Sequence, residues 1–110
     1  MPVHDRYDVT LDHLGDEAVV LVAGEIDLAA QDRLRAVIAQ ARSEQERVVI
    51  DLSATTFMDS SGVKELCDAS FGHSAAGADV VLRSPSRPVR TLLELMGLWA
   101  LLRVEPDPTP

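Results

Sequence analysis

Short runs of β-branched and other apolar residues alternate along this chain with stretches whose apolar residues return every three or four positions. The runs cover residues 18–23, 48–50 and 80–82. Each run predicts a strand that is covered on both faces, and each stretch at helical spacing predicts a helix with one buried stripe. Strands that alternate with helices are joined by right-handed crossovers into a mainly parallel sheet, so the pattern restricts the chain to the α/β class.

Each predicted helix is defined by a stripe of apolar residues and by its ends. The first has Asp27 as a candidate cap, and the second begins at Ser60. Residues 84–88 mark the entrance of the third, because their two prolines are tolerated only in a first turn. Gln31, Arg35 and Arg42 fall on the solvent side of the first helix. Glycines are typical of helix ends, so Gly77 and Gly97 are the expected stops of the second and third helices. The stripes are Ala30, Leu34, Val37, Ile38 and Ala41, then Val63, Leu66, Cys67, Ser70 and Phe71, then Val89, Leu92, Leu93 and Met96.

Two further strands complete the expected sheet. Residues 7–12 alternate apolar and polar, which predicts an edge strand in a hairpin with residues 18–23. Residues 99–104 predict a last strand, and residues 51–59 predict a polar loop before the second helix. The expected architecture is a mixed, mainly parallel sheet of about five strands with an N-terminal antiparallel edge hairpin and about three helices.

Charge and composition argue against several classes of partner. The chain carries 18 acidic and 10 basic residues, a net charge of −8, which repels nucleic-acid phosphates and anionic lipids. The longest apolar run, residues 95–102, is shorter than the ~20 residues that cross a bilayer. Cys67 is the only cysteine, and the start of the chain lacks the pattern of a secretion signal. We therefore expect a cytoplasmic domain that binds neither nucleic acid nor membrane.

The sequence Asp59-Ser60-Ser61-Gly62 places two hydroxyls and a carboxylate at the start of the second predicted helix. The simplest interpretation is a helix cap, provided by Asp59 or Ser60. The free amides and partial positive charge of a helix start would also stabilise a phosphate on Ser61. Gly62 is unfavourable early in a helix, and we expect it to leave room for an approaching protein or nucleotide.

These residues carry a resemblance to a known family. Residues 51–63, which read DLSATTFMDSSGV, resemble the signature of the STAS domain of bacterial anti-sigma factor antagonists. Residues 24–27, GEID, resemble a second loop of that family, and residues 86–102 resemble its last helix and strand. The resemblance implies an α/β fold of the SpoIIAA type, with residues 1–105 as one STAS domain. The Pro-rich residues 106–110 cannot join a strand or a helix, so we expect a tail without fixed structure.

The resemblance also implies a function as a switch. In this family an unphosphorylated antagonist binds an anti-sigma factor that is also a serine kinase, and this binding releases a sigma factor. The kinase then phosphorylates the second serine of the motif, which corresponds to Ser61, and a serine phosphatase reverses the modification. Ser60 is a possible second acceptor. The implied partner-binding residues are Asp27, Asp59, Ser60, Ser61, Gly62 and Lys64.

Two features depart from the family pattern. Lys64 stands where relatives often have a small residue, three positions after Ser61. It is expected to pair with a phosphate, to reshape the docking surface, or to remain a solvated lysine. The family's usual final helix has no counterpart after Val104.

Enzymatic alternatives fit the sequence poorly. Asp51 follows a strand as in a phospho-aspartate receiver, but the acidic pair that would hold Mg²⁺ is missing from the matching place. Neither serine lies in a Gly-x-Ser-x-Gly elbow, and no metal-ligand spacing occurs. We therefore expect no catalytic activity, metal or cofactor. The main alternative is a STAS adaptor subunit of a stress-signalling complex or of a lipid-transport ATPase, without a phosphoswitch.

Overall fold

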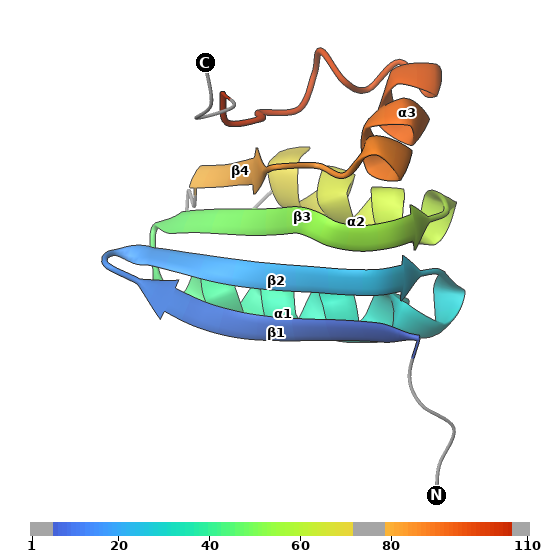
Figure 1. Cartoon of the computed structure of the whole chain (residues 1–110). Helices are drawn as coiled ribbons and strands as arrows, with labels where there is room; N and C mark the ends of the chain where they lie inside the picture. The colour runs from blue at the N-terminus through green and yellow to red at the C-terminus, as the bar shows by residue number, and fades with distance from the viewer. Residues whose placement is uncertain (1–5, 72–78, 107–110) are drawn as a thin grey trace, which may run out of the picture.

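The computed structural model describes residues 6–71 and 79–106 as a sheet with three helices (Figure 1). Gly77, the expected stop of the second helix, and residues 107–110 of the tail lie outside the described residues. The elements in chain order are β1 (Tyr7–Leu14), β2 (Glu17–Ile26), α1 (Leu28–Glu44), β3 (Arg47–Met58), α2 (Ser60–Phe71), β4 (Asp79–Arg83) and α3 (Arg87–Leu95).

The sheet has the order β1-β2-β3-β4. β1 and β2 form an antiparallel hairpin that places β1 at the edge, and the turn between them contains Gly15 with a φ of 64°. β2 pairs with β3 and β3 with β4 in parallel. The expected edge hairpin and the mainly parallel sheet are therefore confirmed.

The core lies between one face of the sheet and the helices α1 and α2, which both lie behind the sheet in Figure 1. Alternate residues of a strand point to the same face, so every second residue along much of β2, β3 and β4 enters this core. The predicted stripe of α1 is buried in full. The strand residues of this core are Ala18, Val20, Val22, Val48, Ile50, Leu52, Val80 and Leu82.

The expected loop at residues 51–59 is wrong, because β3 continues to Met58. Leu52, Thr55 and Met58 are buried at every third position, with two exposed residues between each, while the backbone remains paired with β2. The pairing shifts register twice along β2, between Leu21 and Ala23 and between Gly24 and Glu25. These bulges break strict alternation, so the polar residues of an extended strand resemble a loop in the sequence.

The expected last strand at residues 99–104 is also wrong. The only pairing within residues 99–104 is an isolated bridge between Val104 and Leu82, so the sheet formed by the described residues has four strands instead of about five. Gly97 ends α3 as expected, with a φ of 73°. The next backbone amide, that of Leu98, donates to the carbonyl of Leu93 at 2.8 Å, and that of Leu102 donates to Leu98 at 3.2 Å. Local turns therefore use the hydrogen bonds that a strand would need.

Helix α3 begins against the free edge of β3. β4 pairs with β3 only as far as Asp51, and beyond that point the amide of Ser86 donates to the carbonyl of Leu52 at 3.2 Å. The hydroxyl of Ser86 donates to the carbonyl of Thr55 at 2.6 Å. Val89 and Leu93 of the predicted α3 stripe are buried, whereas Met96 is exposed because it lies beyond the last helical residue.

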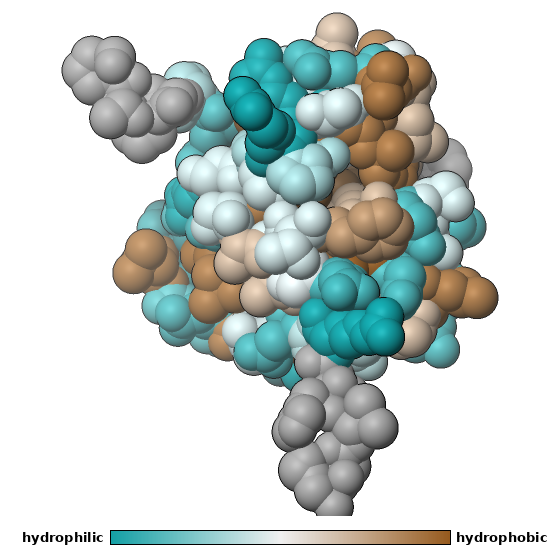
Figure 2. Space-filling model, turned by 45° about the vertical axis from the view of Figure 1, so that its right-hand side comes forward, coloured by the Kyte–Doolittle hydropathy of each residue, from teal (hydrophilic) through white to brown (hydrophobic). Residues whose placement is uncertain are grey.

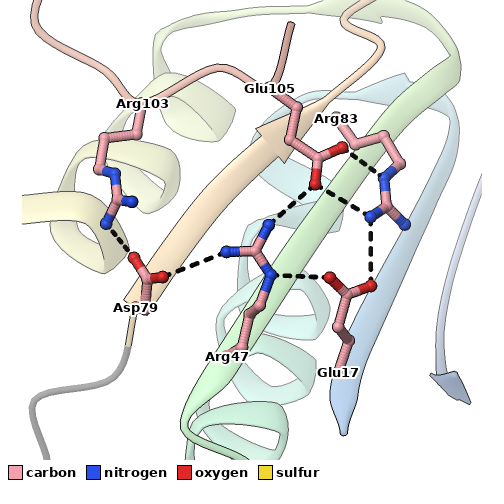
Figure 3. Close-up of polar contacts among 6 residues, drawn as sticks. All are labelled: Glu17, Arg47, Asp79, Arg83, Arg103 and Glu105. Carbon is pink, nitrogen blue, oxygen red and sulfur yellow. Dashed lines mark hydrogen bonds and ion pairs between the residues drawn. The ribbon is translucent and has the colours of Figure 1, made fainter. Parts of the chain in front are cut away.

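An ion-pair network of six residues covers the other face of the sheet (Figure 3). It joins the starts of β2, β3 and β4 to Arg83 and to the segment that follows α3. Arg47 bonds Glu17 at 2.7 Å and Glu105 at 3.0 Å, and Arg83 bonds Glu105 at 2.8 Å. The network therefore fastens the C-terminal segment to the sheet. The remaining pairs are Arg47 with Asp79, Arg83 with Glu17, and Arg103 with Asp79.

Candidate functional site

The starts of α1 and α2 lie side by side at the carboxyl end of the paired strands β2 and β3. Ile26 and Met58 are partners in the register, and each is the last residue of its strand. The amide of Asp59 donates to the carbonyl of Ile26 at 3.1 Å. Asp27 and Asp59, which follow these strand ends, are therefore neighbours. Both helix starts appear at the right of Figure 1.

Each of the two aspartates caps a helix. The carboxylate of Asp27 accepts a hydrogen bond from the amide of Ala29 at 3.0 Å. The carboxylate of Asp59 accepts one from the amide of Ser61 at 2.8 Å. Of the two expected caps for α2, Asp59 is therefore the one that makes the bond. Negative charge at a helix start is stabilised by the helix dipole, so both carboxylates suit their positions.

Ser60 and Ser61 are the first two residues of α2. Ser60 is exposed and Ser61 is half-buried. Among the hydrogen bonds found within the described ranges, none comes from either hydroxyl, although the amide of Ser61 is bonded to Asp59. The hydroxyl of Ser61 therefore lies at a helix start beside a carboxylate, with its oxygen free of bonds to the described part of the chain.

Gly62 is buried, which corrects the expectation that it leaves room for a partner. A Cβ atom at this position would lie 2.7 Å from Cγ of Met58 and 2.9 Å from Cγ2 of Ile26. Both distances are shorter than side-chain carbons tolerate. Only glycine lets α2 begin this close to the ends of the two strands, so Gly62 acts through internal packing.

Lys64 is exposed on α2, and its ammonium group bonds Asp68 at 2.6 Å, one turn further along the helix. Its pKa is raised by the hydrogen bond to that carboxylate. The ammonium group of Lys64 therefore pairs with Asp68 on the same helix and makes no bond to Ser61. Cys67, on the same helix, is half-buried, and burial raises the pKa of its thiol, which makes the thiolate scarce.

Glu65 is a residue of this region that the sequence analysis missed. Only 3% of it is exposed, and it accepts hydrogen bonds from Arg35 at 3.2 and 3.0 Å and from Gln31 at 3.0 Å. The bond to Glu65 raises the pKa of Arg35. The three side chains join α2 to α1 one turn after Ser61. The available signal was the spacing of Gln31 and Arg35, which places both on one face of α1.

Exposed apolar side chains flank the two aspartates, and these were also missed. Leu28, which follows Asp27, is 71% exposed, and Phe57, two residues before Asp59, is 48% exposed. Figure 2 turns this end of the molecule forward and shows apolar patches set among polar surface. Exposed leucine and phenylalanine beside capped helix starts suit a surface that another protein covers.

Neither a metal site nor a membrane span is found in the described part of the chain. No group of three or more histidine, cysteine, aspartate or glutamate side chains in residues 6–71 and 79–106 could hold a metal ion. Within the same ranges, the helices lack the length and apolar character required to cross a bilayer.

Comparison with known proteins identifies the family. The family model described as "Mlab, STAS domain" matches residues 9–103. The Anti-sigma F factor antagonist of Paenibacillus polymyxa is 26% identical over 98 residues, which cover 87% of this chain and 84% of that protein.

Solved structures show the same fold. An anti-sigma factor antagonist from Mycobacterium paratuberculosis superposes with a TM-score of 0.82 at 24% identity, over 98% of this chain and 92% of its own. The unphosphorylated form of the anti-sigma factor antagonist SpoIIAA gives a TM-score of 0.72 at 24% identity, over 91% of this chain and 90% of its own. With the family model spanning β1 to the C-terminal segment, the chain belongs to the STAS domain family.

Proposed function

We propose that this protein is an anti-sigma factor antagonist that binds an anti-sigma factor with serine kinase activity and is switched off by phosphorylation of Ser61. The observation that carries the proposal is the position of Ser61, the second residue of α2, beside the capping carboxylate of Asp59. The names of the relatives from Paenibacillus polymyxa and Mycobacterium paratuberculosis support the same role. The protein acts by binding, without catalysis of its own, in the cytoplasm.

The proposed docking surface consists of Asp27, Leu28, Phe57, Asp59, Ser60, Ser61 and Lys64. Its two apolar members supply area that a partner removes from water, and its aspartates supply charge that selects a basic partner. Gly62 supports the surface from below, because it sets how close α2 begins to the strand ends. Lys64 contributes as a surface contact, since its ammonium is bonded to Asp68.

Phosphorylation of Ser61 would act through charge. A phosphate adds about −1.5 to −2 at neutral pH. The helix dipole favours that charge, so the modified helix stays folded. The same charge is added beside the carboxylate of Asp59, on a surface that a partner must desolvate. A penalty of about 3 kcal/mol would weaken binding by more than a hundredfold, which is sufficient for a switch.

The first test is modification by the cognate kinase. The kinase is obtained by co-purification with the tagged protein from its native cytoplasm, then incubated with ATP and the protein, and intact mass is measured. We expect one phosphate, its loss in Ser61→Ala, and its retention in Ser60→Ala. A serine phosphatase is expected to remove it. A wild type that stays unmodified, or a phosphate that persists in Ser61→Ala and is lost in Ser60→Ala, contradicts the assignment to Ser61.

The second test addresses the docking surface independently of the phosphate. Leu28→Ser and Phe57→Ser change exposed side chains, so the free energy of unfolding is expected to stay within ~0.5 kcal/mol of wild type. Binding to the kinase is expected to weaken at least tenfold. Leu14→Ser is the matched control, because Leu14 is 63% exposed at the opposite end of the hairpin. Equal losses in all three variants would contradict this surface.

The alternative, a STAS adaptor subunit of a stress-signalling complex or a lipid-transport ATPase, uses the same surface without a switch. It is favoured by the exposure of Leu28 and Phe57, which support binding whether or not Ser61 is modified. The two functions differ in one measurement. An adaptor binds its partner equally well as wild type and as Ser61→Asp, whereas a switch loses binding in Ser61→Asp.

A further inference from the structure

A cavity of about 440 Å³ lies at the opposite edge of the sheet from β1, where β4 ends. Its apolar lining comes from Pro85, Trp99, Val104 and Pro106, and its charged lining from Arg83, Arg90 and Glu105. The volume falls within the range of small-molecule sites. In open α/β sheets, ligands characteristically bind in crevices outside the carboxyl ends of strands, and Arg83 is the carboxyl end of β4.

The charge of Arg83 is already satisfied by protein groups. It bonds Glu105 at 2.8 Å and Glu17 at 3.1 Å, as Figure 3 shows, and these bonds raise its pKa. Arg83 therefore forms a fixed part of the wall. Its bonds also hold Glu105 and the adjoining Val104 and Pro106 in place, so the C-terminal side of the cavity is built by the ion-pair network.

Arg90 is the cation available to a ligand. Its guanidinium group lies 4.5 Å from the centre of the Trp99 ring. A guanidinium stacked on an aromatic face keeps its N–H donors in its own plane, where they can meet a carboxylate edge-on. Its present partner is Glu94, at 3.2 Å and about half exposed. An exposed pair four residues apart on a helix is weak, so an incoming anion can replace it.

We propose that this cavity binds a small organic acid with an apolar body. The carboxylate of the ligand pairs with Arg90, and its apolar body packs against Trp99 and the two prolines. The site is separate from the docking surface around Ser61: its lining comes from Arg83 onward in the chain, whereas that surface is built from residues 27–64. The inference therefore stands whether or not Ser61 is phosphorylated.

Trp99 makes the site directly measurable, because it is the only tryptophan in the chain. The full chain is titrated with cyclohexanecarboxylate and with hexanoate, which do not absorb where tryptophan is excited. We expect a saturable change in fluorescence, and a matching calorimetric isotherm, at concentrations up to about 10 mM. The uncharged amides of the two acids are expected to produce no saturable change.

Three variants distinguish the proposed contact from general binding. Arg90→Gln removes the cation and is expected to weaken binding at least tenfold by calorimetry. Glu94→Gln removes the competing carboxylate and is expected to strengthen binding several-fold. Arg87→Gln, on the same helix and outside the cavity lining, is expected to leave binding within twofold. The proposal is overturned if the acids and their amides bind equally well, or if the titration does not saturate. It is also overturned if Arg90→Gln binds the acids as tightly as wild type, or if Glu94→Gln binds them more weakly.

Discussion

Glu65 on α2 and Arg35 on α1 form a two-bond ion pair in which the carboxylate is buried and the guanidinium is about half exposed. Because of this difference in burial, removal of the two partners should reduce the stability of the fold by different amounts. Removal of the carboxylate leaves an arginine that water can solvate. Removal of the arginine leaves a buried carboxylate whose other side-chain partner is Gln31. One substitution therefore measures the effect of an unpaired exposed guanidinium, and the other the effect of an under-bonded buried carboxylate.

We predict that Arg35→Gln destabilises the fold more than Glu65→Gln. An under-bonded buried carboxylate such as that of Glu65 costs about 2 kcal/mol, whereas a glutamine at position 65 keeps part of the hydrogen bonding. The measurement is the free energy of unfolding in urea at neutral pH. Asp32→Asn is the control, because Asp32 is almost fully exposed and lies 3.6 Å from the same arginine. Equal losses in the two variants would contradict the asymmetry.

A second prediction concerns the buried glycine. Gly62→Ala gains helix propensity of up to ~1 kcal/mol, but its Cβ collides with Met58 and Ile26. Overpacking of this kind costs about 1–3 kcal/mol, so we expect net destabilisation. Met58→Ala should open space for the new methyl group. The cost of Gly62→Ala, measured by thermal and urea unfolding, should therefore be smaller in the Met58→Ala background, and strict additivity would argue against the collision.

A third prediction distinguishes two roles of Asp59, as the cap of α2 and as a negative charge beside Ser61. Asp59→Ala loses the bond to the amide of Ser61 and should cost ~1 kcal/mol, whereas Asp59→Asn keeps an acceptor and should cost only a few tenths. If the switch works through repulsion, Ser61→Asp should weaken partner binding several-fold less in Asp59→Asn than in wild type. Binding by calorimetry with all four proteins tests this, and identical effects in both backgrounds would count against repulsion.

The fourth prediction concerns how the stability of the fold depends on pH. The hydrogen bond from Arg47 lowers the pKa of Glu17, and that from Arg83 lowers the pKa of Glu105. A carboxyl whose folded-state pKa is lowered contributes stability above its unfolded pKa, and loses it as the pH falls through its folded pKa. The free energy of unfolding should therefore decrease as the pH falls below the ordinary pKa of a glutamate side chain.

Urea unfolding measured from neutral to about pH 3 checks this dependence. Glu105→Gln should lower stability at neutral pH and flatten the decline in acid. Glu94→Gln is the control, because Glu94 forms an exposed pair with Arg90 outside the network. A decline in Glu105→Gln as steep as that of wild type would show that the network does not cause the acid sensitivity.

The sequence predicted those parts of the fold that depend on local pattern. The stripe of α1, the edge hairpin and the caps Asp27 and Asp59 all follow from spacing and residue type. The second half of β3 could not be found in this way, because its pairing with β2 shifts register between Leu21 and Ala23 and again between Gly24 and Glu25. The last strand failed for a related reason: turns after Gly97 take the backbone bonds of residues that have strand-like side chains.

In the candidate site, too, the features that depend on local sequence were predictable and those that depend on distant residues were not. The position of Ser61 at a helix start was predictable from its neighbours in the chain. The burial of Glu65 was not, because it requires Gln31 and Arg35 from another helix, and those two residues read as solvent-facing in the sequence. The sequence pointed to Gly62 for the wrong reason, because what requires glycine there is the contact with Ile26 and Met58, which only the folded chain brings within reach of it.

The hydrogen bond from the amide of Asp59 to the carbonyl of Ile26 has a consequence for divergence within the family. It ties the end of β2 to the start of α2 through main-chain atoms, which remain whatever side chain stands at either position, proline at position 59 excepted. The exposed neighbours Leu28 and Phe57 can therefore change without displacing the serines. On the proposed docking surface, substitutions at the rim can therefore change the complementarity to a partner while the main-chain geometry at its centre is kept.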